Sequence, residues 1–346
     1  MSTFFKLIFF LLLFTASNET FSQMSRYAIK RNNKQMANYR GQKRDFKDLA
    51  YNAIGLSLNA FNYYGDLSPS AKRGSTDLSL TKPAIGLSFT HRFGPRYQVI
   101  GGLAYGAIKG SDMESADPTD ASNGAYRYVR NLSFRNRITE LSVVAQVDLF
   151  ENTQMFSARP GWTPFAYAGI AVFRHNPQAQ VPGNDLFGQP FANAGEWVNL
   201  QPLKTEGQSY NLFQFAIPFG AGVRFRLADQ MDVSLEFGFR YTFTDYLDDV
   251  SSNYVDLNTF GDNQLARAMS YRSNEVPMGV SAIVDEIIAN RYTGYVGFTT
   301  VNGFGHVNPD GTLNPRGKSN DRDILMLTTL RLNYIIGKNF NRAKFR

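Results

Sequence analysis

The stretch from Met231 to Thr244, M-D-V-S-L-E-F-G-F-R-Y-T-F-T, decides the fold. Large apolar residues occupy every second position, at Val233, Leu235, Phe237, Phe239, Tyr241 and Phe243. The positions between them are small, polar or charged and include Glu236 and Arg240. A period of two over this length predicts a β-strand with two different faces. An aromatic face opposite a charged face is typical of a membrane-barrel strand, apolar towards lipid and polar towards the lumen.

Seven other segments repeat this alternation over a length that suits a tilted membrane strand. They cover residues 51–63, 84–93, 97–108, 134–149, 163–173, 212–227 and 325–336. The predicted fold is therefore all-β: a transmembrane antiparallel up-and-down β-barrel of about eight strands, within residues 51–337. A soluble β-sandwich also has regular strands, but it does not explain the aromatic outward faces.

The connections between these strands alternate in length. Those after the second, fourth and sixth strands are short, whereas residues 64–82, 109–133, 174–211 and 245–324 form long ones. This alternation predicts long outer loops, short periplasmic turns and both termini in the periplasm. In the loop 245–324, helical spacing predicts a short amphipathic helix that packs on the barrel mouth or on a partner, through Val276, Val280, Ile283, Val284, Ile287 and Ile288. Residues 292–300 are a candidate for one more small strand.

The N-terminal residues 1–22 have the features of a secretory signal peptide: Lys6, an apolar run, and small residues before the expected cleavage site. Residues 23–50 form a basic segment expected in the periplasm, and residues 338–346 a periplasmic C-terminal tail. A mobile tail and a docking segment for an acidic partner both fit this charge. Export makes a nucleic-acid partner unexpected, and the predicted location is the bacterial outer membrane, in contact with its lipids.

The lumen side of the predicted barrel carries charged residues. Strand phase places on that side Arg92, Glu140, Arg224, Glu236, Arg240 and Arg331. Charges in a narrow interior persist only when they are paired, and side chains fill the interior of an eight-stranded barrel. We therefore expect a polar core that plugs the lumen. The alternative is a charged constriction in a small-solute channel.

No enzymatic site, cofactor or metal site is predicted. The histidines, His91, His175 and His306, do not form a Ser–His–acid set or a metal-ligand cluster by spacing. The acidic run Asp245, Asp248, Asp249 and Asp256 offers oxygen ligands for Ca²⁺. It lacks the spacing of a calcium loop, so capping of local backbone groups is the preferred interpretation.

Five phrases, in this order along the chain, carry a family resemblance. They are N-Y-Y-G-D-L at 62–67, T-P-F-A-Y-A-G-I at 163–170, L-Q-P-L-K-T-E-G-Q at 200–208, I-P-F-G at 217–220 and F-T-D-Y-L-D-D-V-S at 243–251. Together they resemble the PorG family of outer-membrane β-barrel proteins, over about residues 51–337. The most distinctive parts are Thr-Glu-Gly-Gln and Asp-Tyr-Leu-Asp-Asp.

The resemblance implies a component of the type IX protein secretion system, which also underlies gliding motility in some bacteria. It implies association with a periplasmic ring of PorK-like and PorN-like proteins, and no enzymatic role. We expect the phrases at 62–67, 200–208 and 243–251 to contribute residues to the outer rim, where they either fix the loops or form a recognition surface. The residues concerned are Tyr64, Gly65, Asp66, Thr205, Glu206, Gly207, Gln208, Asp245, Tyr246, Asp248 and Asp249.

Overall fold

The computed structural model describes residues 49–67, 81–154, 156–292, 312–318 and 322–336. The predicted signal peptide, the basic segment up to residue 48, His306 and the C-terminal tail lie outside the described residues. So does the candidate strand 292–300, apart from its first residue. The strands and helices described below all belong to one compact unit.

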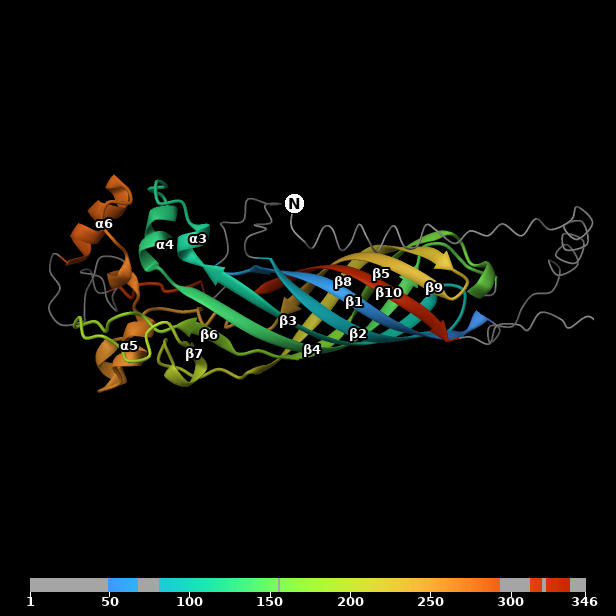
Figure 1. Cartoon of the computed structure of the whole chain (residues 1–346), viewed down its shortest axis with the longest axis horizontal. Coiled ribbons are helices and arrows are strands. Elements are labelled where there is room, and N and C mark those ends of the chain that lie inside the picture. The colour runs from blue at the N-terminus through green and yellow to red at the C-terminus, as the bar shows by residue number, and fades with distance from the viewer. Residues whose placement is uncertain (1–48, 68–80, 155, 293–311, 319–321, 337–346) are drawn as a thin grey trace, which may run out of the picture. The chain divides into compact units, whose positions relative to one another are not determined.

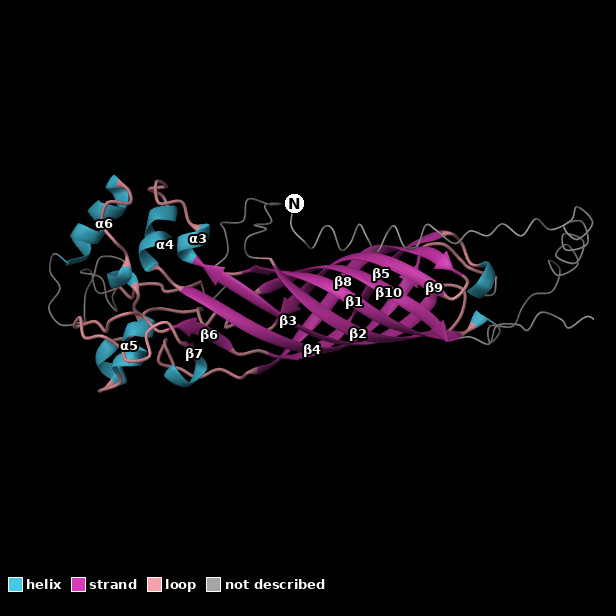
Figure 2. Cartoon of the chain, in the orientation of Figure 1, coloured by secondary structure: helices cyan, strands magenta, loops and turns pink. Residues whose placement is uncertain are grey.

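Long strands form a closed antiparallel barrel (Figures 1 and 2). In wall order they run β3-β2-β1-β10-β9-β8-β5-β4, and pairing of β4 with β3 closes the wall. The strands are β1 (Tyr51–Tyr64), β2 (Lys82–Arg92), β3 (Tyr97–Ser111), β4 (Ser133–Asp148), β5 (Trp162–Arg174), β8 (Phe213–Ala228), β9 (Met231–Thr242) and β10 (Ile324–Ile336). Each corresponds to one predicted strand, so the predicted fold class of an eight-stranded barrel is confirmed.

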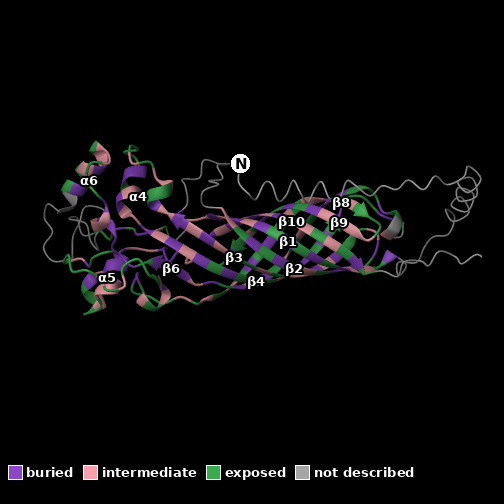
Figure 3. Ribbon diagram, in the orientation of Figure 1, coloured by how far each residue is buried: buried purple, intermediate pink, exposed green. Residues whose placement is uncertain are grey.

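Burial alternates along the strands, as Figure 3 shows. On β9, Leu235, Phe237 and Phe239 are exposed, while Ser234 and Glu236 are buried. Register makes the outward rows continuous, since Leu56 pairs with both Leu87 and Leu332. An exposed apolar surface that extends around a closed barrel is the lipid-facing band of a membrane barrel.

The long connections fold at one end of the barrel, which we call the long-loop end (Figure 2). The other end is the short-turn end, where η2 (Phe156–Ala158) lies. The connections contain α3 (Asp112–Ser115), α4 (Gly124–Arg130), β6 (Pro177–Gln180), β7 (Trp197–Asn199), η3 (Gln201–Leu203), η4 (Leu257–Phe260), α5 (Gln264–Ser270), η5 (Ser273–Glu275) and α6 (Ala282–Tyr292). Of these, only α6 is predicted by the sequence pattern. No helix in the described part of the chain combines the length and apolar character needed to cross a membrane.

The predicted helix in the last long loop is α6, although it begins after Val276 and Val280. Its residues Val284, Ile287 and Ile288 are buried together with Ala125 and Val129 of α4. Two loops that are far apart in the sequence therefore share an apolar core. The hairpin of β6 and β7 extends the wall at the long-loop end, because Gln178 pairs with Arg135 of β4.

Candidate functional site

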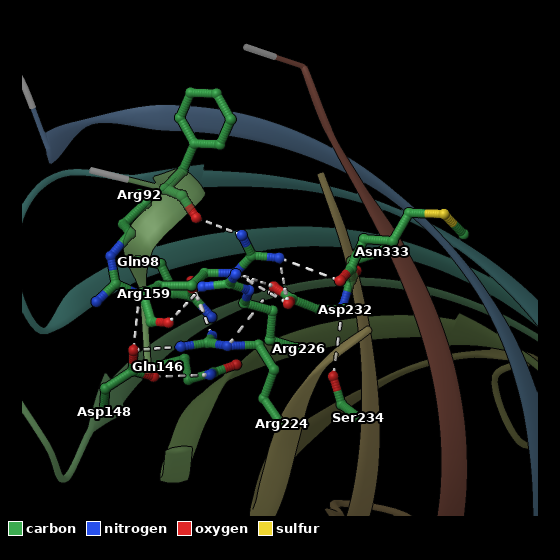
Figure 4. A network of polar contacts seen from close by, with 12 residues as sticks. Arg92, Gln98, Gln146, Asp148, Arg159, Arg224, Arg226, Asp232, Ser234 and Asn333 are labelled. Carbon is green, nitrogen blue, oxygen red and sulfur yellow. Dashed lines mark hydrogen bonds and ion pairs between the residues drawn. The ribbon is translucent and has the colours of Figure 1, made fainter. Parts of the chain in front are cut away.

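Inside the short-turn end, a buried carboxylate joins two strands (Figure 4). Asp148, the last residue of β4, accepts a hydrogen bond from Arg92 Nη1 at 2.6 Å and another from Arg224. Arg92 also donates to the carbonyls of Gly94, at 2.8 Å, and Pro95, at 2.5 Å. The two predicted lumen arginines of this end thus share one acid, which satisfies charges that burial would otherwise penalise.

Arg159 closes the same end from the connection between β4 and β5. Its guanidinium donates to Asp232, with Nε 2.9 Å from Oδ1, and to the carbonyl of Asp229 at 2.6 Å. It also donates to the carbonyls of Ala228 and Met231 at 3.0 and 3.1 Å. One planar, multidentate cation therefore ties the β4–β5 connection to the β8–β9 turn.

Further along the lumen, two more ion pairs involve predicted residues. Arg240 Nε lies 3.1 Å from Glu140 Oε2, and Arg331 Nη2 lies 2.9 Å from Glu236 Oε2. Tyr167 fills space beside Gly238, where an added Cβ would overlap the tyrosine hydroxyl. A cavity of about 20 Å³ is lined by Glu236, Arg331, Gln146 and Arg224, among other residues, which is room for about one water molecule.

The six predicted lumen residues therefore all lie in the interior. The sequence prediction missed Asp148, Asp232 and Arg159. Strand phase offered a signal for the first two, because they continue the phase of Glu140 and Glu236. It offered none for Arg159, which lies outside the strands.

At the long-loop end, the two most distinctive sequence phrases contact each other. The Thr205 hydroxyl donates to Asp249. Glu206 accepts hydrogen bonds from the backbone N–H groups of Ser251 and Ser252, at 3.1 and 2.9 Å. The phrases at 200–208 and 243–251 therefore form one structural unit. The sequence analysis did not predict this contact.

The same contact continues at its exposed edge. Gln208 Nε2 lies 2.5 Å from the hydroxyl of Tyr246, whose ring stacks on Tyr210 at 4.6 Å. Gly207 between these contacts has φ of +73°, a left-handed conformation that favours glycine. This glycine allows the chain to turn between Glu206 and Gln208.

Arg316 holds this contact from a third segment and was not predicted. It is almost fully buried, and its Nη1 lies 3.0 Å from Glu206 Oε1 and 2.6 Å from the carbonyl of Asp249. Its own carbonyl accepts from Arg130, which also donates to the carbonyl of Asp66 at 2.9 Å. We call the segments around Asp66, Glu206, Asp249 and Arg316, together with Arg130, the loop cap.

Acidic side chains meet the end of β1 beneath the loop cap. The hydroxyl of Tyr63 lies 2.6 Å from Asp248 Oδ2 and 2.9 Å from Asp323 Oδ1. An added Cβ at Gly65 would overlap both that hydroxyl and Asp323. Glycine is therefore required at position 65 by close packing. The neighbouring Asp66 accepts the backbone N–H of Lys318 at 2.9 Å.

The remaining predicted rim residues lie nearby. Tyr64 is half-buried, and its hydroxyl lies 3.6 Å from Met326 Sδ. Asp245 lies close enough to Asp323 to influence the ionisation of that carboxyl. Asp256 does not join the acids beneath the loop cap; it caps η4 through the N–H of Asn258 at 2.9 Å.

The described histidines have structural contacts. His175 is buried, with Nε2 3.1 Å from the carbonyl of Asn211, and burial lowers its pKa to about 4. His91 Nδ1 lies 2.6 Å from Asn52 in the barrel wall. Across the residues that the structure describes, no group of three or more acidic or histidine side chains is arranged to hold a metal ion.

Comparison with known families finds one match. Residues 45–186 match the family described as Domain of unknown function (DUF6089), a span that includes β1 to β6. No curated protein matches the chain.

Comparison with solved structures finds weak similarity to several proteins. The attachment invasion locus protein Ail of Yersinia pestis is 7% identical, with 83% of this chain and 99% of that chain covered and a TM-score of 0.34. Neisserial surface protein A is 8% identical, with 82% and 97% covered and a TM-score of 0.33. OprG from Pseudomonas aeruginosa is 7% identical, with 83% and 95% covered and a TM-score of 0.33. The closed wall, the apolar band and the long loops at one end give this chain the architecture of a small outer-membrane β-barrel.

Proposed function

We propose that this protein is a bacterial outer-membrane barrel that works through contacts at its ends and does not conduct solutes. The observation that carries this proposal is the filled lumen, where Glu140 pairs with Arg240, Glu236 with Arg331, and Asp148 with Arg224. An open path would require these buried pairs to separate, and loss of one partner of a buried pair costs about 3–5 kcal/mol. The small volume of the cavity beside Glu236 and Arg331, about 20 Å³, agrees with a closed lumen.

The finer proposal is an anchoring or assembly role in a type IX secretion machine. Its support is the resemblance of the phrases at 62–67, 200–208 and 243–251 to the PorG family. In this proposal the short-turn end faces the periplasm and a ring of PorK-like and PorN-like proteins. The basic segment 23–48 joins the barrel at that end, ahead of Tyr51, and would add electrostatic attraction to the ring.

Crosslinking of intact outer membranes, followed by affinity capture of the barrel and mass spectrometry, tests this role. Wild-type protein is expected to recover ring proteins, and a variant lacking residues 23–48 to recover several-fold less. A variant lacking residues 338–346 is the control, because it shortens the other end of the chain. Undiminished recovery without residues 23–48 would contradict docking through the basic segment.

Conductance of the purified barrel in planar bilayers distinguishes a closed barrel from a small-solute channel. We expect no stable single-channel currents from the wild-type protein. Stable currents would instead favour the small-solute channel that charged lumen residues also allow.

A further inference from the structure

Four basic residues share the outward face of the barrel wall at the long-loop end. Lys109 lies on β3, Arg135 and Arg137 lie on β4, and Arg174 ends β5. We call these four residues the basic patch. They have the same strand phase as the exposed apolar residues Tyr105, Leu141 and Ile170, so the basic patch directly continues the lipid-facing surface.

Register brings the four side chains together. Lys109 pairs with Arg135 on the adjacent strand, and Arg174 pairs with Thr139, two residues from Arg137. Diagonal neighbours on one face of a sheet are roughly 7–8 Å apart. Like charges at such positions repel each other. Contacts within the barrel wall therefore do not explain why these four basic side chains lie together.

Only part of this charge is compensated within the protein. Lys109 Nζ lies 2.6 Å from Glu114 Oε2. Arg135 donates to Gln178 at 3.0 Å and lies 3.8 Å over the ring of Trp197. Arg137 and Arg174 are exposed, and neither side chain has a hydrogen bond or ion pair with any residue that the structure describes.

The position of the basic patch identifies the chemistry of its ligand. On one side of Arg174 lies Phe213 of β8, which is 60% exposed on the lipid-facing surface. A ligand that meets the arginines therefore has its apolar part in the bilayer and its charge at the interface. Arginine guanidinium groups match phosphate oxygens in both geometry and charge, and Trp197 is the kind of residue found at membrane interfaces.

We propose that the basic patch binds the phosphorylated headgroup of a lipid in the leaflet around the long-loop end. Arg137 and Arg174 contact the phosphate, and the acyl chains lie along the band formed by Leu141, Ile170 and Phe213. This proposal requires only that the barrel lies in a bilayer. It is independent of the secretion role and of the closed lumen.

Native mass spectrometry of the full-length barrel, released from nanodiscs that contain diphosphoryl lipid A, tests the proposal. The wild type is expected to retain the lipid, and the double variant Arg137→Gln/Arg174→Gln to retain at least about tenfold less, as loss of charge-assisted contacts implies. The control is Arg96→Gln/Arg322→Gln, which removes two arginine charges outside the basic patch and is expected to retain the lipid. Heat-modifiable migration on gels confirms that each variant is folded.

Three results would overturn the proposal. The first is equal retention of lipid A by the wild type and the Arg137/Arg174 variant. The second is equal retention of dephosphorylated lipid A by the wild type, which would show that only the apolar band binds. The third is complete displacement of lipid A by inorganic phosphate at a concentration of about 1 mM. This result would assign the basic patch to a free anion.

Discussion

Individual residues show where the sequence pattern predicts a position but not a partner. Strand phase places Glu236 and Arg240 inside the barrel from the opening stretch alone. They lie four residues apart on one strand, yet each pairs elsewhere: Glu236 with Arg331 and Arg240 with Glu140. The partners depend on register with β10 and on the width of the lumen, and neither can be derived from the period of a single strand.

Gly65 gives a prediction at this scale. We expect Gly65→Ala to lower the free energy of unfolding of the long-loop end by about 1–3 kcal/mol, because the new methyl group overpacks against Tyr63 and Asp323. The measurement is urea unfolding followed by Trp197 fluorescence in a Trp162→Phe background. The control is Gly101→Ala, where an added Cβ meets nothing within 4 Å; equal effects of both substitutions would refute the packing argument.

At the scale of elements, strands were predictable and most loop structure was not. A strand of twelve residues such as β9 repeats its period often enough to be recognised. The helix α4 has only seven residues, and its few buried apolar positions include Ala125 and Val129, too few to define a helical period. The helix α6, with eleven residues, was long enough. The sequence pattern did not predict the loop cap either, because its contacts join separate loops, such as Thr205 with Asp249 and Glu206 with Arg316.

Glu206 connects the elements of the loop cap, so its removal should open the cap while the barrel stays closed. Glu206→Ala leaves the Arg316 charge and the N–H groups of Ser251 and Ser252 without this acceptor, a change that costs about 3–5 kcal/mol for a buried pair. We expect hydrogen exchange of residues 249–252 to accelerate at least tenfold, while β9 and β10 remain protected. Gln208→Ala, which removes one exposed hydrogen bond, should change exchange little; unchanged protection in Glu206→Ala would contradict the role of Glu206.

Across the whole described barrel, the two ends differ in their buried chemistry. At the short-turn end, arginines outnumber the acids that they contact: Arg92, Arg159 and Arg224 share Asp148 and Asp232. Beneath the loop cap the acids outnumber their partner, because Asp248 and Asp323 both contact the single hydroxyl of Tyr63. That hydroxyl has one proton to donate, so its second contact requires a protonated carboxyl group. The long-loop end is therefore where pH should act on stability.

Burial raises the pKa values of Asp248 and Asp323 well above their usual range, and their proximity adds to the effect on Asp248. A raised folded-state pKa gives stability that is complete below the unfolded value of about 3.9 and is lost as pH rises through the folded value. Burial also raises the pKa of Asp249, to about 6, so its contribution is mostly lost by neutral pH. His175 acts in the opposite direction, because its lowered pKa of about 4 gives stability that is present above about 6.5 and lost as pH falls through 4.

Above about pH 7, His175 is neutral in both states, so Asp248 and Asp323 should dominate the pH dependence. We expect the stability of the long-loop end, measured by Trp197 fluorescence in urea, to fall as the pH rises above about 7, because the raised pKa values keep both carboxyls protonated to a higher pH in the folded than in the unfolded protein. Asp323→Asn should flatten this dependence, because the amide does not ionise: its oxygen can accept from the N–H of Leu247, and its NH₂ group can donate to the Tyr63 oxygen. His175→Asn is the control and should leave the slope above pH 7 unchanged. A wild-type stability that stays constant as the pH rises above about 7 would contradict a proton on either acid in that range.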